Sequence, residues 1–185
     1  MYIKNKEQST ATIKRLGLNR VEEKIFRGDQ AKEIRLYLNE TGFASYGIRD
    51  KDSRGGGGCF KYGVNSEDVM QEAKRYSLCG ICESLIDLDK ENLVLQGEIL
   101  VTEDAHMIAS LSTMKGRSNR EAMKRPPIKI DVSLLRRSPK VQGLNQVLDY
   151  VFKYRLFGVV VEFSLYDCPV GVNRENLIVW ELRNY

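Results

Sequence analysis

Two apolar runs near the end of the sequence each contain a single glutamate. Phe157–Leu165 carries Glu162 within VVVEF, and Leu177–Leu182 carries Glu181 within IVWEL. Runs of this length and composition are typical of buried strands, and the turn residues between them predict a close connection. A carboxylate that loses its water without gaining a partner costs free energy. The two runs therefore predict neighbouring strands that hold counter-charges.

The counter-charge has two interpretations. Carboxylates on neighbouring strands suit Mg²⁺ held between protein oxygens and nucleotide phosphates, which makes Glu162 and Glu181 candidate metal ligands. Alternatively, each glutamate pairs with an arginine, for which Arg155 and Arg183 are candidates. Because Trp180 alternates with Glu181 along the strand, we expect its side chain to pack into the opposite face of the sheet.

Four consecutive glycines lie between two predicted strands, Phe43–Arg49 and Cys59–Val64. They are Gly55, Gly56, Gly57 and Gly58. Because glycine has no Cβ, its backbone amides can close over phosphate oxygens, but such residues also suit a flexible hairpin tip. The segment is not a P-loop, since no Gly-Lys-Ser/Thr follows, nor a dinucleotide fingerprint, since a strand comes next. Both interpretations stay open on the sequence.

The remaining periodicity predicts further helices and strands. Apolar residues recur at helical spacing in Gln8–Leu16, Asp29–Asn39, Ser66–Tyr76 and Lys140–Phe152. Strands are predicted over Lys24–Phe26, Leu78–Ile86, Leu93–Thr102 and His106–Ser112, and a polar loop over residues 113–125. Helices and strands are mixed along the chain, which predicts an α+β fold.

The composition fits a globular chain. It has 185 residues, 42% apolar and 29% charged, which is enough for one good-sized core or two small ones sharing a cleft. No apolar run approaches the ~20 residues needed to cross a bilayer, and the first ten residues lack the apolar core of a secretory signal. We therefore expect a cytoplasmic protein with no membrane partner.

The four cysteines are too few for a disulfide framework. They are Cys59, Cys79, Cys82 and Cys168, and His106 is the only histidine. In a strand, Cys79 and Cys82 would point to opposite faces, so we expect buried reduced thiols, with a redox or metal role as the alternative. His106 is expected to be a surface or turn residue.

Basic residues gather between residues 115 and 140, with only two acids among them. They are Lys115, Arg117, Arg120, Lys124, Arg125, Lys129, Arg136, Arg137 and Lys140. This basic segment either binds phosphates or polyanions, or it is an ordinary solvated loop. It has no interleaved aromatic residues for base stacking, and the net charge of the chain is only +4.

In the order of its parts, the chain resembles the ATP-grasp superfamily over nearly its whole length. NKEQSTATIKRLGLNRVEEKIF resembles the family's opening lysine, helix and glycine. YGIRDKDSRGGGGCFKYGVNSEDVMQEA resembles its phosphate-contacting strand, glycine-rich flap, return strand and helix. GICESLID is similar to the strand that lines the adenine pocket, and LQGEILVTEDAHMIASLS to the hairpin after it. FGVVVEFSLYD and LIVWELRNY resemble the last two strands, which carry metal-binding acids.

The resemblance implies an ATP-grasp-like α+β fold, in which two α+β lobes with antiparallel sheets enclose a nucleotide cleft. Residues 1–80 would form the N-terminal lobe with the glycine-rich flap. Residues 81–185 would form the C-terminal lobe with the metal-binding strands. The implied cofactors are ATP and Mg²⁺.

The resemblance also implies roles for individual residues. Nucleotide contacts are implied for Lys6, Arg49, Gly55, Gly56, Gly57, Gly58, Glu83 and Leu85, with Asp87 or Asp89 at the ribose hydroxyls. Metal binding is implied for Glu162 and Glu181, and catalytic contact with the transferred phosphoryl group or the acid substrate for Arg49, Arg117 and Arg120. Electrostatic neutralisation and positioning would then provide the chemistry.

Three features depart from the family pattern. Arg49 stands where the family most often has lysine, and Arg183 stands where its last motif has asparagine, with Asn184 as the alternative ligand. The chain also begins almost at Lys6, without the domain that many members carry before this lysine. The second substrate site would then be built from the basic segment or supplied by a partner chain or a second copy of this chain. Otherwise the chain is a nucleotide-binding remnant.

Three hypotheses for the function follow. The first is an ATP-dependent ligase or phosphotransferase that activates an acidic substrate through an acyl phosphate, the substrate being an acidic small molecule or a carrier protein. The second is a non-catalytic nucleotide-binding or regulatory subunit of the same fold. The third is a basic nucleic-acid-binding domain.

Overall fold

The structure, a computed structural model, describes residues 3–51, 60–117, 119–122, 128–135 and 139–185. The chain divides into two compact units, each with its own sheet and hydrophobic core. Unit 1 comprises Met1–Arg20 and Leu88–Tyr185, and unit 2 comprises Val21–Asp87. Neighbouring strands in both sheets pair antiparallel. The predicted α+β fold class with antiparallel sheets is confirmed.

The two units have other boundaries than the predicted lobes, which met at residue 80. Residues 1–20 belong with the C-terminal strands, because α1 (Lys6–Arg15) packs against β9 (Glu175–Asn184). Residues 81–87 belong with unit 2, because β4 (Leu78–Glu83) is an inner strand of its sheet. The flap and the metal-binding roles assigned to the lobes stay predictions.

Unit 2 is a four-stranded sheet with helices packed against it, in the strand order β1-β4-β2-β3. Its other elements are β1 (Glu23–Arg27), β2 (Tyr46–Asp50), β3 (Phe60–Val64), α2 (Ala31–Thr41) and α3 (Ser66–Ala73). α2 buries Ile34, Tyr37 and Leu38, which recur at helical spacing on one face. α3 is capped by Asn65, whose side chain accepts a hydrogen bond from the backbone N–H of Asp68.

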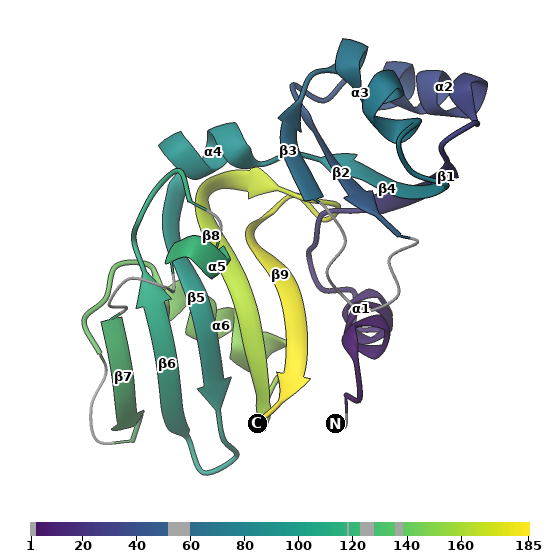
Figure 1. The fold of residues 1–185 in the computed structure, drawn as a ribbon. Helices are drawn as coiled ribbons and strands as arrows, with labels where there is room; N and C mark the ends of the chain where they lie inside the picture. The colour runs from purple at the N-terminus through teal and green to yellow at the C-terminus, as the bar shows by residue number, and fades with distance from the viewer. Residues whose placement is uncertain (1–2, 52–59, 118, 123–127, 136–138) are drawn as a thin grey trace. The chain divides into compact units, whose positions relative to one another are not determined.

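Unit 1 is a five-stranded sheet in the order β7-β6-β5-β8-β9. Its other elements are β5 (Leu93–Val101), β6 (His106–Ser112), β7 (Ile128–Ser133), β8 (Val159–Val170), α5 (Asn119–Ala122) and α6 (Leu144–Lys153). The helix α6 lies along one face of this sheet (Figure 1). It packs Leu144, Val147 and Val151 into the same core as Val161 and Phe163 of β8. The side chains of the alternate residues of each strand therefore point to the opposite face of the sheet.

The buried side chain of Asn19 ties the N-terminal residues of unit 1 to its last two strands. Its Nδ2 donates hydrogen bonds to the carbonyls of Val170, Glu175 and Leu177, at 2.9, 3.1 and 2.9 Å. Its Oδ1 accepts one from the backbone N–H of Asn173 at 2.9 Å. This one amide thus binds four backbone groups of the β8–β9 hairpin.

Hydrogen bonds along α1 and β9 continue this connection. The backbone N–H of Ile3 donates a hydrogen bond to Oδ1 of Asn184, and Nδ2 of Asn184 donates one to the carbonyl of Ile3. The Ser9 hydroxyl accepts from the backbone N–H of Leu182 at 2.7 Å. Residues near the two ends of the chain are therefore held together in one unit.

The predicted elements are found with three differences. The apolar run Leu78–Ile86 is not one strand: β4 ends at Glu83, and the helix α4 (Ile86–Glu91) begins in its last residue. The edge strand β7 and the short helix α5 were not predicted, although the alternating apolar residues Ile128, Ile130 and Val132 were a signal for β7. α6 starts at Leu144, because Gly143 before it adopts φ 80°, a left-handed conformation outside the helix. None of the helices in the described ranges has the length and apolarity to span a membrane.

Candidate functional site

Three glutamates stand in one row across the middle of the unit 1 sheet. Glu98 of β5 lies opposite Glu162 of β8, and Glu162 lies opposite Glu181 of β9. Since Val161 and Phe163 point into the core beside α6, Glu162 points to the opposite face, and its two register partners share that face. Directly opposite residues have Cβ atoms only about 5 Å apart. We call Glu98, Glu162 and Glu181 the carboxylate row.

The carboxylate row is electrostatically crowded. The pKa of Glu162 is raised, first by burial and then by the negative charges of Glu181 and Glu98. The positive charges of Arg183 and Lys6 act in the other direction and lower it. The sequence predicted Glu162 and Glu181 as a pair and Lys6 as part of the same site, and the structure brings these three within electrostatic reach. Glu98 was missed, because only the register between β5 and β8 places it opposite Glu162.

Arginine 183 forms an ion pair with Glu98, the member of the row farthest from its own strand. The predicted arginine thus binds another glutamate, and the alternative that Glu162 and Glu181 each pair with an arginine is not confirmed. Asn184 is not available as a ligand in place of Arg183, because its amide is hydrogen-bonded to both backbone groups of Ile3.

Trp180 lies on the same face as the carboxylate row, and the expectation that it packs on the opposite face is wrong. The register of β8 with β9 shifts between the pairs Glu162–Glu181 and Phe163–Val179, so Trp180 is an extra residue in β9. Such a β-bulge leaves two successive residues opposite one partner and interrupts the alternation of faces. The Trp180 indole donates a hydrogen bond to the hydroxyl of Ser164 at 2.8 Å, and the side chain stays partly exposed.

In unit 2, Arg49 lies on β2, and Lys51, a cation that the sequence did not single out, follows the strand directly. Glu23 of β1 forms an ion pair with Lys51, and its Oε1 lies 4.0 Å from the Nε of Arg49. The Glu23 side chain occupies the space above Gly80 of β4, where a Cβ would come within 2.4 Å of its carboxylate. Glycine at this position therefore allows one carboxylate to hold two cations at the end of β2.

The other residues predicted at the nucleotide belong to several elements of the two units. Leu85 is buried and lies two residues after the end of β4 at Glu83. Asp89 accepts a hydrogen bond from the Tyr166 hydroxyl at 2.8 Å, and burial raises the pKa of its carboxyl. Asp89 therefore has a structural partner within unit 1, whereas Asp87 is the last residue of unit 2. Their predicted contacts with adenine and ribose stay predictions.

Part of the predicted site lies outside the described residues. This holds for Gly55, Gly56, Gly57 and Gly58, and for the side chain of Arg120 in α5. The Arg117 side chain is exposed, and its backbone carbonyl accepts a hydrogen bond from the buried amide of Gln96 at 3.2 Å. The catalytic roles of Arg117 and Arg120 stay predictions.

Cys79 and Cys82 are buried free thiols, as expected. Burial raises the pKa of Cys79 to about 11 and that of Cys82 to about 12, so neither is a thiolate at neutral pH. Cys168 is only partly buried. His106 Nε2 lies 2.6 Å from Asp131 on the exposed surface of the β6–β7 pair, as expected for a surface residue.

Oxygen donors in the carboxylate row suit one Mg²⁺ ion. In the part of the chain that the structure describes, no three His, Cys, Asp or Glu side chains are arranged to hold a metal by themselves. Mg²⁺, however, is usually bound by one or two carboxylates, with water and nucleotide phosphates as the other ligands. Glu162 and Glu181, opposite each other on neighbouring strands, supply two such carboxylates.

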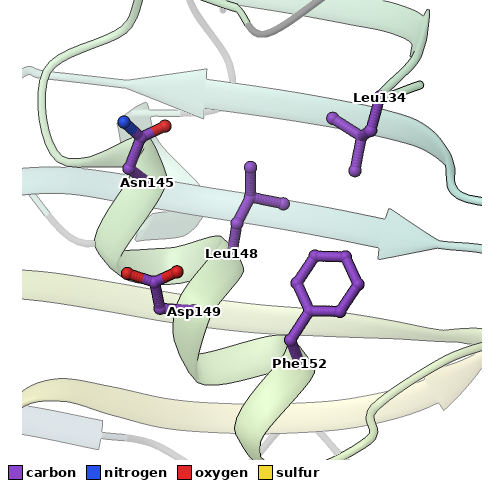
Figure 2. A pocket seen from close by; sticks show the side chains of 5 residues that line it. All are labelled: Leu134, Asn145, Leu148, Asp149 and Phe152. Carbon is purple, nitrogen blue, oxygen red and sulfur yellow. The ribbon is translucent and has the colours of Figure 1, made fainter.

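A shallow hollow lies on the other side of the unit 1 sheet, over α6. It has a volume of about 220 Å³, and Figure 2 shows the side chains that line it: Leu134, Asn145, Leu148, Asp149 and Phe152. None of these residues belongs to the predicted site. The hollow is therefore separate from the carboxylate row, since α6 covers the face opposite the glutamates.

The chain is similar to known proteins in its structure, whereas the sequence comparisons found no match. The sequence matches no family model and no curated protein. The chain is similar to N5-carboxyaminoimidazole synthetase from Staphylococcus aureus, with a TM-score of 0.53 and 15% identity over 97% of this chain and 43% of that one. It is also similar to D-alanine-D-alanine ligase from Helicobacter pylori, with a TM-score of 0.52 and 12% identity over 97% of this chain and 53% of that one.

A third similar structure contains ligands. It is N5-carboxyaminoimidazole synthase from Aspergillus clavatus in complex with ADP and 5-aminoimidazole ribonucleotide, with a TM-score of 0.51 and 14% identity over 97% of this chain and 44% of that one. These enzymes have the ATP-grasp fold, so the resemblance of the chain to the ATP-grasp superfamily is confirmed at the level of the fold. The chain spans about half the length of the proteins it matches.

Proposed function

We propose that the chain binds ATP and is an ATP-dependent ligase or phosphotransferase that activates an acidic substrate through an acyl phosphate. The observation that carries the proposal is the pair Glu162–Glu181, in register on neighbouring strands of an ATP-grasp fold. Burial and then the negative charge of Glu181 raise the pKa of Glu162, so a cation beside the pair lowers the free energy of its charged form. ADP in one of the similar structures makes ATP the first nucleotide to test.

Glu162 and Glu181 would hold Mg²⁺, which when bound supplies neutralisation of the nucleotide phosphates. Lys6, whose positive charge acts on Glu162, would bind a phosphate oxygen. Arg49 would do the same in unit 2, where Glu23 holds its guanidinium in place together with Lys51. These side chains carry fixed charges that position phosphates, and phosphoryl transfer asks for little else from a protein.

The reaction would proceed in two steps. A carboxylate oxygen of the acidic substrate attacks the γ-phosphorus of ATP, the bond to the β-γ bridging oxygen breaks, and ADP leaves with that electron pair. An amine or thiol then attacks the acyl carbon and inorganic phosphate leaves. Arg117 and Arg120 of the basic segment would bind the transferred phosphoryl group or the acid.

The first test is thermal unfolding of the full chain with and without millimolar ATP and MgCl₂. A ligand at about 100 times its dissociation constant stabilises a protein by about 2.7 kcal/mol, which raises the midpoint by about 5–10 °C for a chain of this size. We expect this shift in the wild type and in Glu103→Gln, a control in the exposed turn between β5 and β6. Glu181→Gln should lose most of it. An equal shift in Glu181→Gln, or no shift in any protein, contradicts the proposal.

Turnover is tested separately, by ADP release in the presence of carboxylic acids and hydroxylamine, which captures acyl phosphates as hydroxamates. A specific observation favours the second hypothesis, a non-catalytic nucleotide-binding subunit: Arg183 occupies the position expected for a metal ligand and is paired with Glu98. That hypothesis predicts the ATP-dependent shift without ADP release from any acid. Nucleic-acid binding, the third hypothesis, predicts instead an affinity that falls steeply with salt.

A further inference from the structure

We propose that Arg183 is a built-in counter-cation of the carboxylate row, so that the row accommodates one divalent cation and excludes a second. This inference rests on the proposed binding of a cation by Glu162 and Glu181. It adds that the charge of the row is set within the protein, by an arginine on the last strand.

The strand order requires Arg183 to reach across β8. Arg183 is on β9 and its ion-pair partner Glu98 is on β5, and these two strands flank β8. Neighbouring strands lie about 4.8 Å apart, so the two backbones are about 10 Å apart. Only an extended arginine and glutamate side chain together span this distance. The guanidinium must therefore lie above β8, beside Glu162.

The neighbours of Arg183 fit this position. Arg183 lies opposite Val160, which is two residues before Glu162 and on the same face of β8. The apolar stem of the arginine can thus cross Val160 while its charged end reaches Glu98. The arginine therefore lies over the middle of the row as well as against Glu98.

Charge counting then limits what the row can bind. Leaving aside Lys6, whose positive charge also acts on Glu162 and stays the same in every variant, Glu98, Glu162 and Glu181 carry three negative charges and Arg183 carries one positive charge, so the net charge is −3 + 1 = −2. One divalent cation neutralises this charge. A second would bring two more positive charges next to a guanidinium that is held in place, and like charges at such distances repel.

An arginine at this position carries a free-energy cost that an apolar residue would not have. Its Nε is buried and has no hydrogen-bond acceptor among the described residues, which costs free energy. The ion pair with Glu98 offsets the cost, and this makes the positive charge the feature that distinguishes Arg183 from an apolar residue of similar size.

The experiment measures Mn²⁺ binding to the nucleotide-free full chain, with Mn²⁺ as a spectroscopically visible substitute for Mg²⁺. Stoichiometry and affinity are obtained from the free-ion electron paramagnetic resonance signal. The variants are Arg183→Met, Arg183→Lys, Glu98→Gln and the double variant Arg183→Met/Glu98→Gln. Arg15→Met, on the exposed end of α1, is the matched control. Circular dichroism verifies that each variant is folded.

The net charge of the row ranks the expected affinities. It is −3 in Arg183→Met, −2 in the wild type and in the double variant, and −1 in Glu98→Gln. We expect about tenfold tighter binding or a second Mn²⁺ ion in Arg183→Met, wild-type behaviour in the double variant, Arg183→Lys and Arg15→Met, and about tenfold weaker binding in Glu98→Gln.

Equal Mn²⁺ binding by Arg183→Met and the wild type would overturn the inference, as would a double variant that fails to return to the wild-type value. So would the absence of Mn²⁺ binding in all the proteins, Arg183→Met included. Because no nucleotide is present, the expected ranking supports the inference even if ATP later gives no thermal shift. In that case the proposed function would be wrong, but the role of Arg183 as a counter-cation would still be supported.

Discussion

The indole of Trp180 donates a hydrogen bond to the hydroxyl of Ser164, on the sheet face that carries Glu162. Trp180 is the only tryptophan of the chain, so its fluorescence reports on this face alone. The contact exists because of the bulge in β9, which turns Trp180 toward the carboxylate row.

Replacement of Ser164 by alanine should shift the Trp180 emission to longer wavelength. The indole loses its acceptor and becomes more hydrated, and the lost hydrogen bond should cost about 0.5–1.5 kcal/mol of unfolding free energy. Fluorescence spectra and urea unfolding measure the two effects. Ser110→Ala, two strands away in β6, serves as the control. Unchanged emission in Ser164→Ala would show that the hydrogen bond does not hold the indole in solution.

Replacement of Asn19 by leucine should destabilise unit 1 strongly. The change keeps the side-chain size but removes all four side-chain hydrogen bonds, including those to the buried carbonyls of Val170 and Leu177. Since each bond contributes about 0.5–1.5 kcal/mol, we expect a loss of about 3 kcal/mol or more. Asn173→Ala loses only an exposed bond to the Gly17 carbonyl and should cost less than about 1 kcal/mol. Similar losses in the two variants, measured by denaturant unfolding, would contradict the role of Asn19.

Replacement of Gly80 by alanine should displace the Glu23 carboxylate from Lys51 and Arg49. The new Cβ would lie 2.4 Å from the Glu23 Cδ, so the side chain must move. We expect a loss of about 1–3 kcal/mol, typical of overpacking. Adding Gly80→Ala to Glu23→Ala should cost much less than adding it to the wild type, because the obstructing side chain is absent. Additive losses in this double-mutant cycle would mean that Gly80 is needed for another reason.

The pH dependence of stability should change when Glu162 is replaced by glutamine. The pKa of Glu162 is higher in the folded than in the unfolded chain, so the folded protein binds this proton more tightly. Stability therefore falls as the pH rises from the unfolded to the folded pKa, and it stays lower above both values. Glu162→Gln removes this loss. Its melting temperature relative to the wild type should accordingly be higher at pH 7 than at pH 4, and the opposite trend would disprove the assigned direction.

Much of the fold follows from local patterns in the sequence. The apolar spacing of Val147 and Val151 predicted the helix α6, and the alternation on both sides of residues 103–105 predicted the β5–β6 hairpin. The pair Glu162–Glu181 was recognisable because a charge within an apolar strand needs a partner. In each of these cases the relevant signal lies within a few residues.

The features that the sequence did not predict depend on the pairing of strands that are distant in the sequence. Glu98 joins the carboxylate row only because β5 pairs with β8 in one register, and Arg183 reaches Glu98 only because β8 lies between their strands. Trp180 was assigned to the wrong face because a bulge breaks the two-residue period without a marker in the sequence. Lys51 and Glu23 were missed because Gly80, which makes room for their contact, lies on a third strand.

The hydrogen bonds between Ile3 and Asn184 have a consequence for synthesis on the ribosome. Unit 2 is one continuous stretch, whereas unit 1 combines the first twenty residues with the last ninety-eight. Since translation is vectorial and compact stretches fold as they emerge, residues 21–87 can reach their native state while α1 still has no sheet to pack against. The helix must wait until β9 has left the exit tunnel. The nascent chain therefore carries a folded insert between the two parts of unit 1, and α1 gains its packing partner only when β9 is made.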